Sequence, residues 1–584
     1  MRQIASRVAF AALLLVSLAA ALPHGDDEGM DMNKDSGMDM DMQASASAAA
    51  SADNAESPMS YFKYNKHSTS IMAHIVLMVL GWCFVLPAAV MLSIARSRLA
   101  LPSQFLFLVF NAFGLLLGII YNTSTPDLYE NNAHHKIGWI ATWVISVQVV
   151  LALIFAYAGR GESASQSPSY ERAAFLPVAT DESTHVFPTG PMHEYRWSRD
   201  SGQGTEPGSP NHSPGSPSSE MPDYDGFEKP EDEQPAPAPR RWFPSTFVDR
   251  FLSHRVPGMV SNRVLRIFNG VYNVIDRIIL PFGFVAIATG AVTYGGIMRD
   301  REIFNGLAHF IKGGIFFWYG ILTLGRYIGC WADLGWAWNK KPPASVVGNW
   351  KSKAPSGEFT ESFVIWLYGV TNVFLEHLSS WGGAWSATDL EHVSISILFF
   401  GGGLAGMLFE SSRIREALNN TILRSPPHGT RDEGWQAPKS QGVSLNPMPA
   451  LIILLLGMMM GSHHQTSMTS TMVHKQWGNM LVGFALARGL TYVLLFLRPP
   501  TSYLPARPPT EIISAFCLIA GGLIFMMSTR NVIDAMEYYE LDAMFTFTVG
   551  LGLTAFIIAL EILFISLKAW AVRREQRPLS FHFS

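Results

Sequence analysis

The sequence predicts an all-α fold, a polytopic transmembrane helical bundle of about eleven spans, on three observations. First, 48% of the 584 residues are hydrophobic and only 15% are charged, whereas soluble domains carry about 25% charged residues. Second, apolar segments recur that approach the roughly 20 residues a helix needs to cross a bilayer. Third, lysine and arginine concentrate in alternate loops. These observations exclude an ordinary soluble enzyme, and a net charge of −4 gives no reason to expect a nucleic-acid partner.

The chain begins with a segment typical of a secretory signal peptide, residues 1–21. Arg2 and Arg7 precede the apolar run 8–21, and Ala19 and Ala21 supply the small residues of a cleavage site. An uncleaved anchor is the alternative. Residues 22–60 then form a tail rich in methionine and aspartate, which we expect to be disordered on the outer side of the membrane.

The expected spans fall into a group of three and a group of eight. The first three lie at residues 71–95, 103–121 and 137–157, and the others at 278–298, 303–324, 362–375, 394–409, 448–462, 477–497, 512–528 and 544–567. With the N-terminus outside, most loop lysines and arginines fall on the inner side, which is the distribution that fixes orientation. The sequence thus predicts an integral membrane protein of the secretory pathway (endoplasmic reticulum, vacuole or plasma membrane). Its N-terminus would be lumenal or extracellular and its C-terminal tail, 571–584, cytosolic.

Two segments separate the groups of spans. Residues 160–240 are rich in serine, proline, glycine and acidic residues and have too few apolar residues to form a core. We therefore expect a disordered cytosolic linker, which could bind cytosolic partners. Residues 241–277 combine arginines with aromatic residues such as Trp242 and Phe243, which predicts a basic amphipathic segment on the membrane surface.

The histidines are unevenly distributed along the chain. An ionisable group inside a span is costly and often functional, although any one of them could simply bond to a neighbouring helix. Of the 17 histidines, eleven fall on the expected outer side or in the outer part of a span: His24, His67, His74, His134, His135, His309, His377, His392, His463, His464 and His474. This bias predicts a polar or metal-bearing layer near one face of the membrane.

Two of these histidines lie in motifs that resemble the cytochrome b561 family. The stretch Ala73-His74-Ile75-Val76, followed by Gly81-Trp82 and Pro87, resembles the family's first heme-carrying helix. The stretch His134-His135-Lys136-Ile137-Gly138, followed by Gln148, resembles a later helix of the same core. For residues 61–159, the three-span domain, the resemblance implies that His74 and either His134 or His135 are axial ligands of heme b. Two imidazole ligands leave no coordination position open, which favours electron transfer over oxygen binding.

The resemblance is incomplete, and it is partly repeated further along the chain. The family uses a second histidine pair near the other face, but the expected spans 103–121 and 278–298 contain no histidine. Electrons would then have to cross most of the bilayer unaided. In the second group of spans, Ala308-His309-Phe310-Ile311 repeats the first motif, and His474-Lys475 followed by Gly478 repeats the second. A duplicated pair of His309 with His474 is therefore expected, also near the outer face.

The whole organisation resembles the fungal YTP-like family of multispan integral membrane proteins. Shared motifs include Glu376-His377, Trp381-Gly382-Gly383, Asp389-x-Glu391-His392 and His463-His464. The resemblance covers about residues 60–158 and 247–570, so that residues 278–570 form the eight-span YTP-like domain. It implies this architecture, and of activity it implies only a loose similarity to electron-transport proteins.

Copper binding is the alternative to heme. Thioethers are soft ligands that suit Cu(I), and the outer tail contains Met30, Met32, Met38, Met40 and Met42. A second His/Met set is expected in an outer loop: His463, His464, Met468 and Met472. The simpler interpretation of the tail is a low-complexity acidic segment with incidental methionines.

Charged residues inside spans give a further expectation. Lys312, Arg488 and Glu561 lie in apolar surroundings, and Arg488 is predicted to pair with Glu561 because an unpaired charge there would be costly. No nucleophile–base arrangement or phosphate loop is evident. Three hypotheses remain: a heme-binding electron-transfer protein or membrane oxidoreductase, a copper-handling protein, and a non-catalytic scaffold that works through its cytosolic linker.

Overall fold

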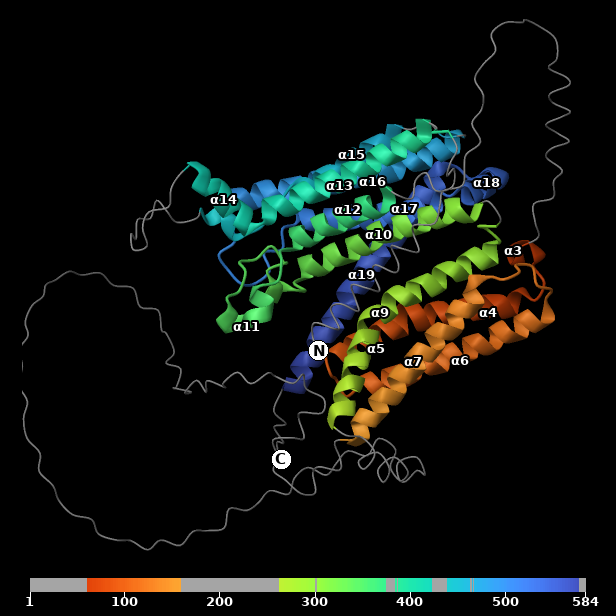
Figure 1. The fold of residues 1–584 in the computed structure, drawn as a ribbon. Helices are drawn as coiled ribbons and strands as arrows, with labels where there is room; N and C mark the ends of the chain where they lie inside the picture. The colour runs from red at the N-terminus through yellow and green to blue at the C-terminus, as the bar shows by residue number, and fades with distance from the viewer. Residues whose placement is uncertain are drawn as a thin grey trace, which may run out of the picture. The chain divides into compact units, whose positions relative to one another are not determined.

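The computed structural model describes residues 60–158, 262–299, 302–373, 384–385, 387–422, 438–462, 465 and 467–576. Every regular element among these residues is a helix, so the predicted all-α fold is confirmed (Figure 1). The described helices within 60–153 and 263–576 belong to one compact unit. The expected signal peptide, most of the outer tail and the linker 160–240 lie outside the described residues.

Each expected span coincides with a described helix. Within the described residues, nine helices are long and apolar enough to cross a membrane. They are α4 with η1 and α5 (Ser68–Val79, Leu80–Val85, Leu86–Ile94), α6 (Ala100–Ser124), α7 (Ala133–Ala158), α9 (Asn262–Gly295), α10 (Glu302–Ile328), α13 (Ala387–Glu410), α16 (Met468–Leu497), α17 (Thr510–Met527) and α19 (Ala543–Gln576). The two remaining spans correspond to the shorter α12 (Gly357–Val373) and α15 (Met448–Ser462). Short helices occupy the loops: α3 (Tyr61–Tyr64), η3 (Ala332–Leu334), α11 (Ala344–Ser352), α14 (Ser412–Ile422), η5 (Lys439–Gly442) and α18 (Arg530–Tyr538).

The first bundle contains four helices rather than the three of the expected domain. Helix α9 packs with α4–α5, α6 and α7 around one core, in which Trp82, Phe107, Ile145 and Ile279 are buried. The first helix is not regular: the π-helical turn η1 precedes Pro87, which has no N–H to donate to the preceding turn. The expected surface segment 241–277 is described only from Asn262 on, where it forms the first half of α9.

The helices α10, α12, α13, α15, α16 and α17 form a second bundle. Close glycine contacts hold neighbouring helices of this bundle together. A Cβ atom on Gly522 of α17 would lie 2.6 Å from the Gly313 carbonyl oxygen of α10, and one on Gly478 of α16 would lie 2.7 Å from the Gly457 oxygen of α15. Small residues are what membrane helices use for such close approach, because lipid gives no hydrophobic drive for association. These contacts hold α10 against α17 and α15 against α16.

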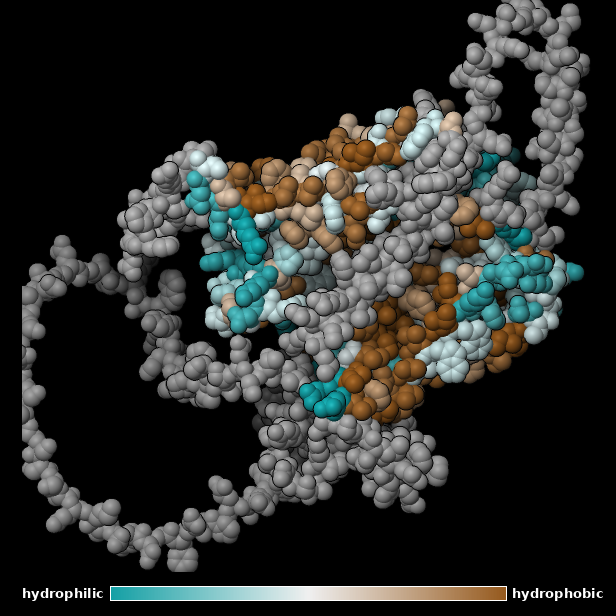
Figure 2. Space-filling model, viewed as in Figure 1, coloured by the Kyte–Doolittle hydropathy of each residue, from teal (hydrophilic) through white to brown (hydrophobic). Residues whose placement is uncertain are grey.

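The surface of the described residues matches a bilayer environment. Figure 2 shows hydrophobic residues along the sides of the helices and hydrophilic ones gathered near α3 and α18 at one end and near α11 and α14 at the other. Large apolar side chains such as Trp143 and Phe496 are more than half exposed, which in water would be unfavourable but in lipid is expected.

Candidate functional site: two histidine pairs

The first histidine pair lies at the end of the first bundle that carries α3. His74 of α4 and His134 of α7 face each other, with ring centres 6.4 Å apart and ring planes at 81°. Both residues lie near the N-terminal ends of their helices. The structure therefore selects His134 over His135, whose side chain follows at the next helical position and is exposed.

Backbone carbonyl groups fix the orientation of both rings. The Nδ1 atom of His74 lies 2.7 Å from the carbonyl oxygen of Gly114 on α6, and that of His134 lies 3.1 Å from the carbonyl oxygen of Ala286 on α9. A carbonyl oxygen can only accept a hydrogen bond, so Nδ1 carries the proton and the lone pair is on Nε2. This is the tautomer of a histidine that binds a metal through Nε2.

Glycines make room for both rings against neighbouring helices. A Cβ atom on Gly118 of α6 would lie 2.9 Å from Nδ1 of His74, and one on Gly290 of α9 would lie 3.0 Å from Cε1 of His134. A Cβ atom on Gly118 would be closer than real Cβ atoms come, and one on Gly290 would be closer than most, so replacing either glycine requires the neighbouring ring to shift.

The second pair repeats this arrangement in the second bundle. His309 of α10 and His474 of α16 lie with ring centres 6.0 Å apart and ring planes at 89°. The Nδ1 atom of His309 lies 2.7 Å from the Asn305 carbonyl oxygen, and that of His474 lies 2.8 Å from the Ser470 carbonyl oxygen. Here each carbonyl is four residues earlier in the same helix, but the resulting tautomer is the same as in the first pair.

Aromatic side chains shield the second pair. Phe525 of α17 meets His309 edge-on at 5.4 Å, and Trp477 lies 5.9 Å from His474 while stacking on Phe525 at 4.1 Å. His474 is only 7% exposed and Trp477 only 1%. Two buried polar atoms beside the pair, Asn305 Oδ1 and Trp477 Nε1, have no hydrogen-bond partner among the described residues.

The other residues expected to bind metal are not brought together in the part of the chain that the structure describes. The five tail methionines, His463 and His464 lie outside the described residues. Met468 and Met472 are 74% and 53% exposed, one turn apart on α16. Across the described ranges, no group of three or more histidine, cysteine, aspartate or glutamate residues could hold a metal ion.

The expected pair of Arg488 with Glu561 is wrong. Arg488 of α16 binds Glu511 of α17 at 2.8 Å and Glu361 of α12 at 3.2 Å, whereas Glu561 Oε2 of α19 has no hydrogen-bond partner among the described residues. The reason is that Arg488 lies among Tyr319 of α10, Glu361 of α12 and Glu511 of α17, whereas the carboxyl group of Glu561 lies beside Gly325 of α10. Arg326 joins the same cluster by binding Glu358 and Glu361.

Sequence reasoning also missed a carboxylate in the first bundle. Asp276 of α9 is 6% exposed and accepts hydrogen bonds from Ser93 of α5 at 2.7 Å and from Gln148 of α7 at 2.5 Å. It lies away from the histidine pair, since ten residues of helix, about 15 Å, separate it from Ala286. The sequence signal for this buried carboxylate was Asp276 itself, an aspartate inside the segment 241–277 that was interpreted as a surface helix.

The fold and these sites define a multispan integral membrane protein whose histidines pair at one end of the bundle. Residues 282–569 match the family model described as "Protein YTP1-like, C-terminal", and residues 55–158 match a domain of unknown function, DUF2427. The chain belongs to this YTP1-like family.

Three relatives are fungal proteins. An uncharacterized membrane protein of Schizosaccharomyces pombe is 32% identical over 521 residues, which covers 88% of this chain and 97% of the relative. An uncharacterized membrane protein of Saccharomyces cerevisiae is 38% identical over 331 residues, 55% of this chain and 51% of the relative. Protein YTP1 of the same yeast is 24% identical over 275 residues, 47% of this chain and 49% of the relative. No solved structure matches the chain.

Proposed function

We propose that the chain is a membrane electron-transfer protein that binds two b-type hemes, one between the histidines of each pair. The main support is that two pairs on different helices share one arrangement. In each pair the ring centres lie 6.0 or 6.4 Å apart, the ring planes are nearly perpendicular and both Nδ1 atoms donate to backbone carbonyl oxygens.

The ring separations agree with one metal atom shared by two imidazoles. A metal–nitrogen bond of about 2.0 Å on each side, together with about 1.1 Å from each nitrogen to its ring centre, puts the two ring centres roughly 6.2 Å apart. The observed separations of 6.4 and 6.0 Å lie on either side of this value.

The donor set fits heme better than a bare ion. A metal ion bound only by the protein usually has four or more ligands, and no group of three candidate ligands exists among the described residues. Heme iron already carries four porphyrin nitrogens, so two imidazoles complete its coordination and leave no position for oxygen. When bound, heme would supply a one-electron redox couple.

The residues around each pair have separate roles in this proposal. Gly114 and Ala286 orient the first pair through their carbonyl oxygens, and Gly118 and Gly290 give the rings room. Around the second pair, Phe525 and Trp477 exclude water, which favours the less charged redox state. Both pairs lie toward the end of the bundle that the lysine and arginine distribution assigns to the outer side, so we expect the electron donor and acceptor to meet the protein at that face.

A visible spectrum of the purified full-length protein tests the proposal. The expected result is a Soret band, sharpened α and β bands on reduction with dithionite, and two hemes per chain. Because the ring planes are nearly perpendicular, the ferric protein should also give the strongly anisotropic low-spin electron paramagnetic resonance signal of crossed imidazole ligands.

Matched variants separate the two sites. His74→Ala and His309→Ala should each remove one heme, and the double variant should be colourless. His135→Ala is the control, since that exposed side chain adjoins His134 without facing His74. A folded, monodisperse protein that stays colourless when expressed with excess heme precursor would rule the proposal out.

Copper binding is the second candidate. Met468 and Met472 present two exposed thioethers one turn apart on α16, and thioethers favour Cu(I). Elemental analysis of the same preparation distinguishes the candidates, because copper without a Soret band would favour the second. Replacing both methionines with leucine should then lower the copper content and leave any heme spectrum unchanged.

A further inference from the structure

A network of buried ion pairs lies at the end of the second bundle away from the histidines. Arg326 of α10 binds Glu358 at 2.7 Å and Glu361 at 2.5 Å, both on α12. Arg488 of α16 binds the same Glu361 at 3.2 Å and Glu511 of α17 at 2.8 Å. The two guanidinium groups and three carboxyl groups thus form one continuous chain across four helices.

The charges of this network do not balance. Two arginines face three glutamates, and none of the five side chains is more than 11% exposed. The exposed fractions are 5% for Arg326, 1% for Arg488, 4% for Glu358, 11% for Glu361 and 0% for Glu511. The hydroxyl groups of Tyr319 and Thr323, which accept from Arg488, add no charge. An uncompensated charge is costly inside a protein and more so inside a membrane, so the odd carboxylate requires a partner.

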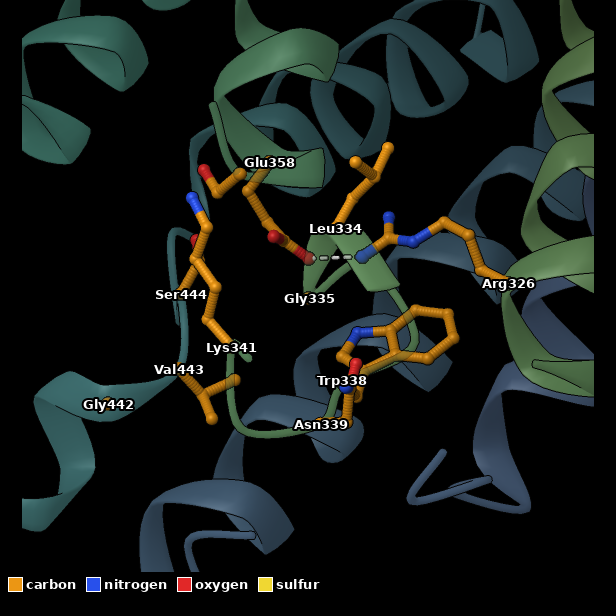
Figure 3. Close-up of a pocket in the computed structure, with 11 residues that line it drawn as sticks. Arg326, Leu334, Gly335, Trp338, Asn339, Lys341, Glu358, Gly442, Val443 and Ser444 are labelled. Atoms are coloured by element: carbon orange, nitrogen blue, oxygen red, sulfur yellow. Dashed lines mark hydrogen bonds and ion pairs between the residues drawn. The ribbon is translucent and has the colours of Figure 1, made fainter. Parts of the chain in front are cut away.

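A small pocket lies beside this network. Its volume is about 70 Å³, and Arg326, Glu358, Trp338, Lys341 and Ser444 are among the residues that line it (Figure 3). One water needs about 10–15 Å³ measured in this way, so the pocket has room for several. The Trp338 indole nitrogen is buried without a hydrogen-bond partner among the described residues, and a water in the pocket would accept a hydrogen bond from its N–H group.

Other charged groups at the pocket leave the imbalance unchanged. Lys341 lines the pocket, where its ammonium group donates to the Ala354 carbonyl oxygen. Glu410 of α13 accepts from Ser356 and Ser444, which also line it. These two residues contribute one charge of each sign, so the sum over the network and the pocket is still one negative charge.

We propose that the network of Arg326, Arg488, Glu358, Glu361 and Glu511 holds one exchangeable proton, which enters and leaves through the pocket beside Glu358. The proton is shared, because each glutamate is linked to the next through an arginine, and strongly interacting carboxyl groups titrate as a unit. The network is a one-proton store open to the lysine- and arginine-rich end of the bundle. It does not depend on whether heme binds at the other end.

Infrared spectroscopy of the full-length protein in lipid nanodiscs tests the proposal. The wild type should show the C=O stretch of a protonated carboxyl group, and the band should shift within the mixing time when H₂O is replaced by D₂O. This measurement on the wild type needs no variant to fold. Ser444→Trp, which fills the pocket, should slow the shift at least tenfold.

Glutamine variants test whether the proton is shared. Glu358→Gln, Glu361→Gln and Glu511→Gln should each abolish the same band, since any of them leaves two carboxylates facing two arginines. Glu561→Gln is the matched control: it should remove any band that the unpartnered carboxyl group of Glu561 gives itself and retain the band of the network. The proposal is overturned if the wild type has no such band, if none of the three variants removes it, or if the wild type instead shows stabilisation specific to Na⁺ or K⁺, which would make the partner a metal cation.

Discussion

The ring centres of His309 and His474 lie 6.0 Å apart. The two residues belong to α10 and α16, which both pack closely on α17. Phe525 of α17 contacts His309 and stacks on Trp477, which lies beside His474, so aromatic contacts connect α17 with both histidines. The first pair reaches a similar separation with different supports, the carbonyl groups of α6 and α9. Two structural routes to one geometry indicate that the geometry itself matters.

The glycine behind His74 provides a direct test of the first pair. In Gly118→Ala the new methyl group would lie 2.9 Å from Nδ1 of His74, so the ring must move and its bond to the Gly114 carbonyl must lengthen. We expect the heme content to fall from two toward one per chain, measured by the pyridine hemochrome assay. Gly138→Ala on α7, with open space around the new methyl group, should retain both hemes. Equal losses in the two variants would contradict this role of Gly118.

The contact between α10 and α17 should be sensitive to one added methyl group. A Cβ atom on Gly522 would lie 2.5 Å from the Phe317 backbone nitrogen and 2.6 Å from the Gly313 oxygen, and backbone atoms cannot move aside cheaply. Gly522→Ala should lower stability by about 1–3 kcal/mol, as overpacking does, measured by thermal unfolding in detergent. The control is Gly552→Ala on α19, where a Cβ atom meets nothing within 4 Å; an equal loss there would mean that packing is not the cause.

Buried and exposed arginines should differ sharply in their contribution to stability. Arg488→Met leaves Glu361 and Glu511 facing each other without their shared cation, and loss of one member of a buried ion pair costs about 3–5 kcal/mol. Arg98→Met breaks a pair with Glu575 whose side chains are 54% and 24% exposed, which costs less than about 1 kcal/mol. Thermal unfolding of both variants checks the difference. Similar values for the two would show that the network is hydrated.

Hydropathy predicted the helices because a span is nearly a local property, whereas the histidine pairs were expected from the resemblance of two short motifs to a known family and from the repetition of these motifs. A span needs only a long apolar segment, and all eleven expected segments are helical. Four histidines near the N-terminal ends of spans that run in one direction must lie at one depth, so the candidates for pairing were few. The choice of His134 over His135 was left open by the sequence, because it depends on how α7 is rotated toward α4.

The ion network could not be predicted in the same way. Glu361 directly precedes the expected span 362–375, and Arg326, Glu358 and Glu511 lie at the ends of helices, where charges are ordinarily solvated. The loop containing Trp338 covers them. The centre of the Trp338 ring lies 4.3 Å from the guanidinium carbon of Arg326 and 5.4 Å from that of Arg488. The pairing of Arg488 depended on which helices surround α16, and hydropathy carries no such information.

The thiol of Cys330, just beyond the end of α10, should react slowly with alkylating reagents. Burial raises its pKa above the ordinary value, although Lys568 nearby acts in the opposite direction. Since only the thiolate reacts, the rate of reaction with iodoacetamide at pH 8 should be lower than that of free cysteine. The midpoint of the increase in this rate with pH should lie above the ordinary thiol pKa of about 8.5. Mass spectrometry of the Cys330 peptide over a pH series measures this, with an introduced exposed cysteine as reference. A midpoint at or below the ordinary value would contradict the effect of burial.

Orientation in the membrane can be tested with one residue from each end of the bundle. Tyr538 on α18 is 75% exposed at the end near the histidine pairs, and Trp350 on α11 is 54% exposed at the other end. In a background in which the three native cysteines are replaced by alanine, we introduce Tyr538→Cys or Trp350→Cys. If the end with the histidines faces outward, as the positive-inside distribution predicts, a membrane-impermeant maleimide added to sealed right-side-out vesicles labels only the first variant. Both should label after permeabilisation, which serves as the control for accessibility. Labelling of Trp350→Cys alone in sealed vesicles would invert the topology and move the proposed heme ligands to the cytosolic face.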